Sequence, residues 1–273
     1  PDRSRGCFQK ESVSNDNTSS TRWKKVSSKD ILKELSSITT KDKTAIVTSN
    51  SFSAARKSIL SELCDSGFKH FTYEAIDLTK PENFLGEALK SDSALRAIPK
   101  FENAKRVLSI DSDFLGYREP NSASNTKQFM KGRKVLSSKD AKKMNRLYSV
   151  ESDLSLAGGF ADHRLRLSSS EMLAFSSLVL LSLLKSNKDK DSNIIAHLEK
   201  LSESMDSHKE WVNACTKDLL QNPKNSLVIA GSHLPKSVHL ITYKINEILA
   251  NTGTCLDYIT VEPSASDLSE FVE

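Results

Sequence analysis

The sequence is poor in cysteine and contains no cluster of metal ligands. Its four cysteines stand far apart, and no two of them form a C-x-x-C pair. The spacings that bind zinc or iron–sulfur clusters are therefore absent, and we expect separate thiols in or near the core. Long apolar runs are missing too. The longest, residues 178–184 with Ser182 inside it, is far shorter than the ~20 residues that span a membrane and is typical of a buried helix.

Other missing features exclude further classes of function. Neither G-x-G-x-x-G nor G-x-x-x-x-G-K-[ST] occurs, so no glycine-rich fingerprint of nucleotide binding is present. The net charge is only +4, and the basic residues are spread along the chain, so we predict no nucleic-acid partner. The chain begins without methionine. We expect an internal fragment, in which a missing signal peptide carries no information on export.

Short apolar runs of strand type alternate with helical segments along most of the chain. This alternation predicts an α/β, Rossmann-like fold, in which a mostly parallel sheet is covered by helices on both faces. Residues 168–171 form a capping-box pattern before an apolar helix at 172–184, which we expect at the centre of the core. The expected strands are 44–48, 70–75, Arg106–Ile110, 147–150, Ser226–Ala230 and Leu256–Val261.

Composition and pattern suggest four parts. Residues 1–21 are polar and serine-rich, without hydrophobic periodicity, and predict a loop or a disordered lead-in. Residues 22–185 carry the main α/β region. A charged stretch and two amphipathic helices make residues 186–225 a helical linker segment, and residues 226–273 form a C-terminal βαβ unit of the same domain.

Polar residues follow several of the expected strands, at the edge where open α/β sheets bind ligands. Asp111 or Asp113 could accept a hydrogen bond from a ribose hydroxyl, and a serine at a helix start could meet a phosphate. The alternative is that each residue caps the next helix or forms the turn, and for each cluster taken alone we favour that alternative. The candidates at these strand ends are Ser49, Asn50, Asp111, Asp113, Gly231 and His233.

The densest candidate lies at 145–167, where Glu151 ends an expected strand and Asp162-His163-Arg164 follows a loop with two adjacent glycines. A carboxylate can orient an imidazole for acid–base catalysis, which makes these three residues weak catalytic candidates. Neighbours on an extended segment point to opposite faces, however. We therefore favour a buried ion pair and hydrogen-bond cluster that pins the loop to the next strand. His233 and His239 have no further ligands clustered nearby in the sequence, so we predict no metal site.

The segment 145–171, NRLYSVESDLSLAGGFADHRLRLSSSE, closely resembles part of the molybdopterin-oxidoreductase-like half of the large iron–sulfur subunits of bacterial alternative complex III, a respiratory quinol oxidoreductase family. Other stretches match in the same order: PDRSRG and Thr-Arg-Trp near the start, RVLSIDSDFLG at 106–116, FMKGRK at 129–134, and SLVIAGSHLPKSVHLITYKINEILANTG at 226–253. The resemblance extends from residue 1 to about residue 263.

The resemblance implies a fold like that of the molybdopterin-guanine-dinucleotide enzymes of the dimethyl-sulfoxide-reductase type. In those enzymes a strand end like Glu151 and a P-G-T-D-like turn help to hold the cofactor. Here the turn reads Ser-Ser-Ser-Glu and ends at Glu171, and the N-terminal cysteine cluster of the family is missing. The resemblance therefore implies a domain without its own cofactor. Glu151, Glu171 and the strand-end candidates would be the remains of a site.

The function implied is a scaffold domain of a membrane-associated quinol:electron-acceptor oxidoreductase complex. It would dock a ferredoxin-like half of the same subunit, which would follow Glu273 and carry the iron–sulfur clusters, together with cytochrome and membrane subunits. It would lie at the periplasmic face of the bacterial inner membrane and meet the membrane only through partners. Two alternatives stay open: a functional molybdopterin-dependent oxidoreductase domain with chemistry near Asp162-His163-Arg164, and a stand-alone α/β domain that binds a small molecule.

Overall fold

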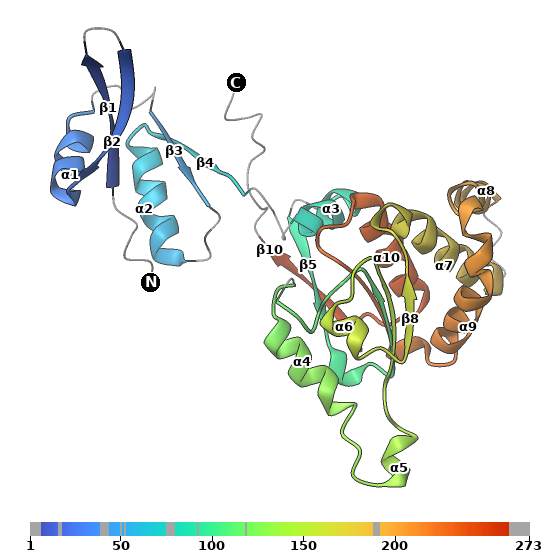
Figure 1. The fold of residues 1–273 in the computed structure, drawn as a ribbon. Coiled ribbons are helices and arrows are strands. Elements are labelled where there is room, and N and C mark those ends of the chain that lie inside the picture. The colour runs from blue at the N-terminus through green and yellow to red at the C-terminus, as the bar shows by residue number, and fades with distance from the viewer. Residues whose placement is uncertain are drawn as a thin grey trace. The chain divides into compact units, whose positions relative to one another are not determined.

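The computed structural model describes residues 7–15, 18–38, 44–49, 51, 53–74, 80–91, 93–117, 119–187 and 192–261. These residues divide into two compact units, 7–74 and 80–261, and each is described by itself (Figure 1). The expected boundaries at 21, 185 and 225 do not coincide with this division. The physical reason is that the first parallel strand pair closes a small sheet of its own and does not join the main sheet.

The first unit begins with an antiparallel hairpin, where the serine-rich composition predicted a loop or a disordered lead-in. Its two strands pair in register over their whole length. Backbone hydrogen bonds define this hairpin, which is why hydrophobic periodicity did not indicate it. The elements of the unit are β1 (Cys7–Asn15), β2 (Thr18–Val26), α1 (Ser28–Ser36), β3 (Ala45–Thr48), α2 (Ala54–Asp65) and β4 (Lys69–Thr72), with β3 and β4 parallel.

The second unit is built on a four-stranded parallel sheet in the order β8-β7-β6-β9. Its strands are β6 (Arg106–Ile110), β7 (Arg146–Glu151), β8 (His163–Arg166) and β9 (Ser226–Ala230). The helices around it are α3 (Lys80–Ala88), η2 (Phe101–Asn103), α4 (Ser122–Lys131), α5 (Ser138–Ala141), α6 (Leu156–Gly159), η3 (Ser169–Glu171), α7 (Met172–Ser186), α8 (Ser192–Leu201), η4 (Glu203–His208), α9 (Lys209–Leu220), η5 (Pro223–Asn225) and α10 (Lys236–Ile248).

Two hydrophobic cores cover the two faces of this sheet, so the predicted α/β fold class is confirmed. Alternate residues of β6 point to opposite faces of the sheet and belong to different cores. Leu108 and Ile110 pack against α7, α9 and α10, while Val107 packs against η2, α4 and α6. The helix α7 is buried along most of its length, as its uniformly apolar sequence predicted. Among the described residues, no helix combines the length and apolarity needed to cross a membrane.

The last strand corrects the expected C-terminal βαβ unit. The strand β10 (Leu256–Val261) does not extend the parallel sheet but pairs antiparallel with β5 (Ala94–Pro99). The edge of β9 that it would have joined is already occupied, because Asn246 of α10 donates to the Val228 carbonyl at 2.7 Å and accepts from the Val228 N–H at 3.0 Å. A buried asparagine thus takes the place of a neighbouring strand.

Replacing Asn246 with alanine is expected to lower the free energy of unfolding by about 2 kcal/mol, because both polar groups of the buried Val228 peptide lose their partner. Urea unfolding measures this loss, and hydrogen exchange should show faster exchange at Val228. Asn213→Ala is the matched control, because Asn213 bonds Ser182 at the surface and its loss should cost well under 1 kcal/mol. Equal effects of the two changes would contradict the assigned role.

Candidate functional site

The strand order places a switch point between β6 and β9. The chain moves from β6 outward to β7 and β8 and then returns to add β9 on the other side of β6, and ligands of open α/β sheets bind at such a point. Asp111 follows β6 and Gly231 follows β9. Their backbones lie so close that a Cβ atom on Gly231 would stand 2.2 Å from the Asp111 carbonyl oxygen. Glycine is therefore required here by the approach of two loops.

Asp111 is the centre of this strand-end region, and it adopts a left-handed backbone conformation with φ of +47°. Its carboxylate accepts hydrogen bonds from the Ser152 N–H at 3.1 Å and the Ser169 hydroxyl at 3.2 Å, and it lies 3.3 Å from His233 Nε2. Burial alone raises the pKa of Asp111, but its contacts with His233 and Ser152 outweigh this, and its pKa lies below the ordinary value. The carboxylate thus ties three loops together.

Asp113 and Glu119 extend the same network on the loop after β6. Asp113 is buried and accepts from the Ala157 N–H at 3.0 Å. Glu119 accepts from the Ser232 N–H at 3.0 Å, which joins the loop after β6 to the loop after β9. Burial raises the pKa of Glu119 above its usual value, against the opposing effect of the Ser232 bond. Sequence reasoning missed Glu119, because no pattern within its own loop pointed to a partner so far along the chain.

Glu151, the last residue of β7, is the most enclosed of these carboxylates, with 3% of its surface exposed. It pairs with Arg164 Nε at 2.5 Å and accepts from the Ser155 hydroxyl at 2.5 Å. The loop also packs tightly against it, since a Cβ atom on Gly158 would stand 1.7 Å from Glu151 Oε1. The prediction that Glu151 stands at a strand end is confirmed, and its two oxygens are bound by its own loop and by β8.

The structure places Asp162 and His163 apart from Glu151, although Arg164 of the same group pairs with Glu151. Residue His163 pairs with Tyr148 near the start of β7, whereas Glu151 lies at its end. Asp162 accepts from Arg133 Nη2 at 2.6 Å and from the Leu147 N–H at 2.8 Å. The His163 ring stacks on Tyr148, with the ring centres 4.7 Å apart.

Each member of the group thus has a different partner, and Asp162 does not orient His163. Their bonds join the start of β8 to Arg133 and to β7, but all three residues of the group are exposed, so the predicted burial is wrong. Asp162 and His163 also lie near the amino ends of the strands, away from the edge at which open sheets bind ligands.

The remaining candidates have separate positions. Ser49 follows β3 in the first unit and is exposed, and Asn50 lies outside the described residues. Glu171 accepts from the Ser168 N–H at 2.9 Å, so the predicted capping box is confirmed and its carboxylate closes the start of η3. Its neighbour Ser169 belongs to the network through its bond to Asp111. We name the residues that the structure joins at the carboxyl ends of the strands the strand-end cluster: Asp111, Asp113, Glu119, Glu151, Arg164 and His233.

His239 lies in the first turn of α10, beside the loop after β9. Burial lowers its pKa from 6.5 to about 4, only partly offset by the Leu234 backbone. The unfolded chain therefore binds a proton more readily, so the stability that neutral His239 contributes is present above pH 6.5 and is lost as the pH falls from 6.5 toward 4.

Replacing His239 with glutamine should remove a loss of stability that occurs between pH 6.5 and pH 4. We expect the wild type to lose on the order of 2 kcal/mol more than the variant over this range, measured by urea unfolding at each pH. His208→Gln is the control at the end of η4, outside this region. Parallel pH curves for His239→Gln and the wild type would contradict the assignment.

The strand-end cluster does not suit a molybdopterin dinucleotide. Its carboxylates at 111, 113, 119 and 151 outnumber its one guanidinium group, at 164, and a diphosphate would enter a region of like charge. Asp111, Asp113 and Glu151 already accept hydrogen bonds from the chain itself. Across the described parts of the chain, no three His, Cys, Asp or Glu side chains are arranged to hold a metal ion.

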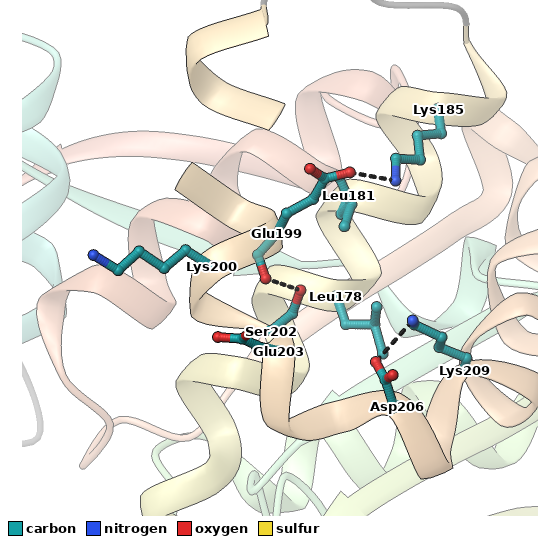
Figure 2. A pocket seen from close by; sticks show the side chains of 9 residues that line it. All are labelled: Leu178, Leu181, Lys185, Glu199, Lys200, Ser202, Glu203, Asp206 and Lys209. Atoms are coloured by element: carbon teal, nitrogen blue, oxygen red, sulfur yellow. Dashed lines mark hydrogen bonds and ion pairs between the residues drawn. The ribbon is translucent and has the colours of Figure 1, made fainter. Parts of the chain in front are cut away.

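A pocket of about 450 Å3 lies elsewhere, among α7, α8, η4 and α9 (Figure 2). Leu178 and Leu181 contribute its apolar lining. Two ion pairs, Lys185–Glu199 and Lys209–Asp206, each 2.7 Å long, lie among its lining residues. The charged groups that line it are thus largely paired with one another, and none of the lining residues belongs to the strand-end cluster.

Comparison with known proteins identifies the fold. No protein-family model matches the chain, and no curated protein matches it. Among solved structures, the chain is similar to acetylene hydratase from Pelobacter acetylenicus, with 14% sequence identity and a TM-score of 0.51 over 88% of this chain. At this identity the similarity shows the fold alone, and it agrees with the predicted α/β, molybdoenzyme-like fold. The chain spans about a third of the neighbour's length, since the match covers 34% of it.

Proposed function

We propose that the chain is a scaffold domain, without a cofactor of its own, of a membrane-associated respiratory quinol:electron-acceptor oxidoreductase complex. The observation that carries the proposal is that three strand-end carboxylates already accept hydrogen bonds from the chain itself. Asp111, Asp113 and Glu151 hold the chain's own loops at the sheet edge where a cofactor of this fold would be expected. A bound dinucleotide would have to break these bonds and then place its phosphates beside the freed carboxylates.

The partners and location belong to the same proposal and come from the resemblance of residues 145–171. The domain would dock a ferredoxin-like half of its own subunit, which carries the iron–sulfur clusters, and the cytochrome and membrane subunits of the complex. It would lie at the periplasmic face of the bacterial inner membrane, in contact with the membrane through these partners only. The proposal includes no nucleic-acid partner.

Purification of the full-length protein from its native membranes in mild detergent tests the scaffold role. We expect haem absorption bands and the electron paramagnetic resonance signals of iron–sulfur clusters to elute together with the chain. Elution of the chain alone, with substrate turnover of its own, would overturn the proposal.

A second function, a working molybdopterin-dependent oxidoreductase domain, is favoured by the structural similarity to acetylene hydratase. In that case His163→Ala would abolish turnover and leave stability unchanged. The stacking of His163 on Tyr148 leads us to expect the opposite result: a loss of about 1 kcal/mol of stability and no change in the activity of the complex. Thermal unfolding and quinol oxidation, measured on the same preparation, distinguish the two.

A further inference from the structure

The connection between β7 and β8 leaves large apolar side chains exposed. It contains only the single-turn helix α6, whereas the connection from β8 to β9 contains the long helix α7. Leu154, Leu156 and Phe160 are 66%, 50% and 47% exposed within this short connection. Single exposed apolar residues are common on protein surfaces, but these three all lie on the connection that leads directly into β8.

Beside this connection, β8 forms an edge of the parallel sheet. It pairs with β7 on one side, and no other described strand pairs with it. The opposite edge strand, β9, is closed by the Asn246 side chain. Within the described ranges, no side chain makes such a bond to the backbone of β8. Proteins usually protect an edge of this kind, because its free backbone groups can pair with another chain.

The charges on β8 decide which chain can pair with it. Its sequence is His-Arg-Leu-Arg. Arg164 is paired with Glu151, but Arg166 is exposed and has no ion-pair partner among the residues that the structure describes. A second copy would place basic strands side by side, and like charges on paired strands are destabilising. A segment with acidic side chains would instead place carboxylates opposite Arg166.

We infer that β8, together with Leu154, Leu156 and Phe160, binds an extended segment of a partner protein in which acidic and apolar side chains alternate. We call these residues the β8 docking edge. The segment adds a strand to the sheet, so that backbone hydrogen bonds supply affinity and its acidic side chains supply specificity. The inference rests on the proposed function, since it names the surface through which a scaffold would hold a partner subunit.

A labelled peptide of alternating glutamate and valine is the probe, and the same peptide with lysine in place of glutamate is its control. We expect the acidic peptide to bind the full chain in a fluorescence anisotropy titration, to weaken as salt is added, and to slow hydrogen exchange at the β8 amides. The lysine peptide should not bind. Arg166→Glu should weaken binding at least about fivefold, whereas Lys142→Glu, the same charge change on an exposed residue outside this surface, should not.

Three results would overturn the inference: no protection of β8 by the acidic peptide, equal binding by Arg166→Glu and the wild type, or equal binding of the lysine peptide. Analytical ultracentrifugation of the free chain tests whether a second copy of the chain occupies the β8 docking edge instead. A dimer that protects the β8 amides would show that a second copy binds there and would also overturn the inference. These readouts do not depend on cofactor content, so molybdenum in the full-length protein would refute the proposed function and leave this result standing.

Discussion

Replacing Asp218 with asparagine should lower the free energy of unfolding by about 3 kcal/mol. Asp218 projects from α9 toward the starts of two central strands. Its Oδ2 atom lies 2.7 Å from Arg106 Nε and 2.7 Å from Arg146 Nη1, and it accepts from the Tyr148 hydroxyl at 2.8 Å. One carboxylate thus compensates the charge of two guanidinium groups while joining a helix to β6 and β7. Asparagine keeps the shape and removes the charge, which leaves both arginines without compensation.

The control for this change is Asp206→Asn, because Asp206 pairs with Lys209 in an exposed position where a lost ion pair costs less than about 1 kcal/mol. The pH dependence gives a second readout. Burial raises the pKa of Asp218, but the bonds from Arg106 and Tyr148 lower it more, so its folded-state pKa lies below 3.8. Its stabilisation is present above pH 3.8 and lost as the pH falls through the folded pKa. The Asp218→Asn variant should therefore lack this pH-dependent loss of stability when it is unfolded by acid. If Asp218→Asn is as stable as Asp206→Asn, the account is contradicted.

A methyl group added at Gly158 should destabilise the fold by about 3 kcal/mol. The new Cβ atom would stand 1.7 Å from Glu151 Oε1 and 2.3 Å from its carboxyl carbon. Glu151 cannot swing away freely, because it is buried and bound by Arg164 and Ser155. Gly158→Ala therefore has to break a partly buried ion pair or shift the loop that carries α6. Urea unfolding measures the loss, and hydrogen exchange should show faster opening of residues 152–162.

The neighbouring glycine provides an internal control for this prediction. A Cβ atom on Gly159 would meet nothing within 4 Å, and alanine is favoured over glycine in a helix by roughly 0.5–1 kcal/mol. Gly159→Ala should therefore leave the stability unchanged or raise it slightly. If Gly158→Ala and Gly159→Ala behave alike, Glu151 is not held as the structure shows, and the strand-end cluster loses its most enclosed member.

Much of the fold could be predicted from local sequence. Arg106–Ile110, Ser226–Ala230 and Leu256–Val261 are strands with the predicted bounds, since each is a short apolar run between polar turns. The strand β5 was missed because it carries Arg96 and ends in a proline, and β8 because it has a single apolar residue. Both strands exist through pairing with distant segments. The pairing of β10 with β5 was hidden for the same reason, since nothing local tells a strand which neighbour it will find.

The candidate site was predictable in place but not in detail. Alternation of strands and helices put Asp111, Glu151 and His233 at strand ends, and the structure gathers them at one edge of the sheet. The contribution of Glu119 depends on Ser232, a partner 113 positions away, and no periodicity carries such information. Neither could the sequence show that the connection after Glu151 crosses the sheet, which separates Glu151 from Asp162.

The cofactor content of the full-length protein tests the central claim most directly. The claim is that the strand-end carboxylates hold the chain's own loops and leave no cradle for molybdopterin. The protein should be purified from its native host, grown with molybdate, and analysed for molybdenum by mass spectrometry and for pterin by the fluorescence of its oxidised form. We predict iron from partner clusters but neither molybdenum nor pterin in stoichiometric amount. Stoichiometric molybdenum together with pterin would contradict the account.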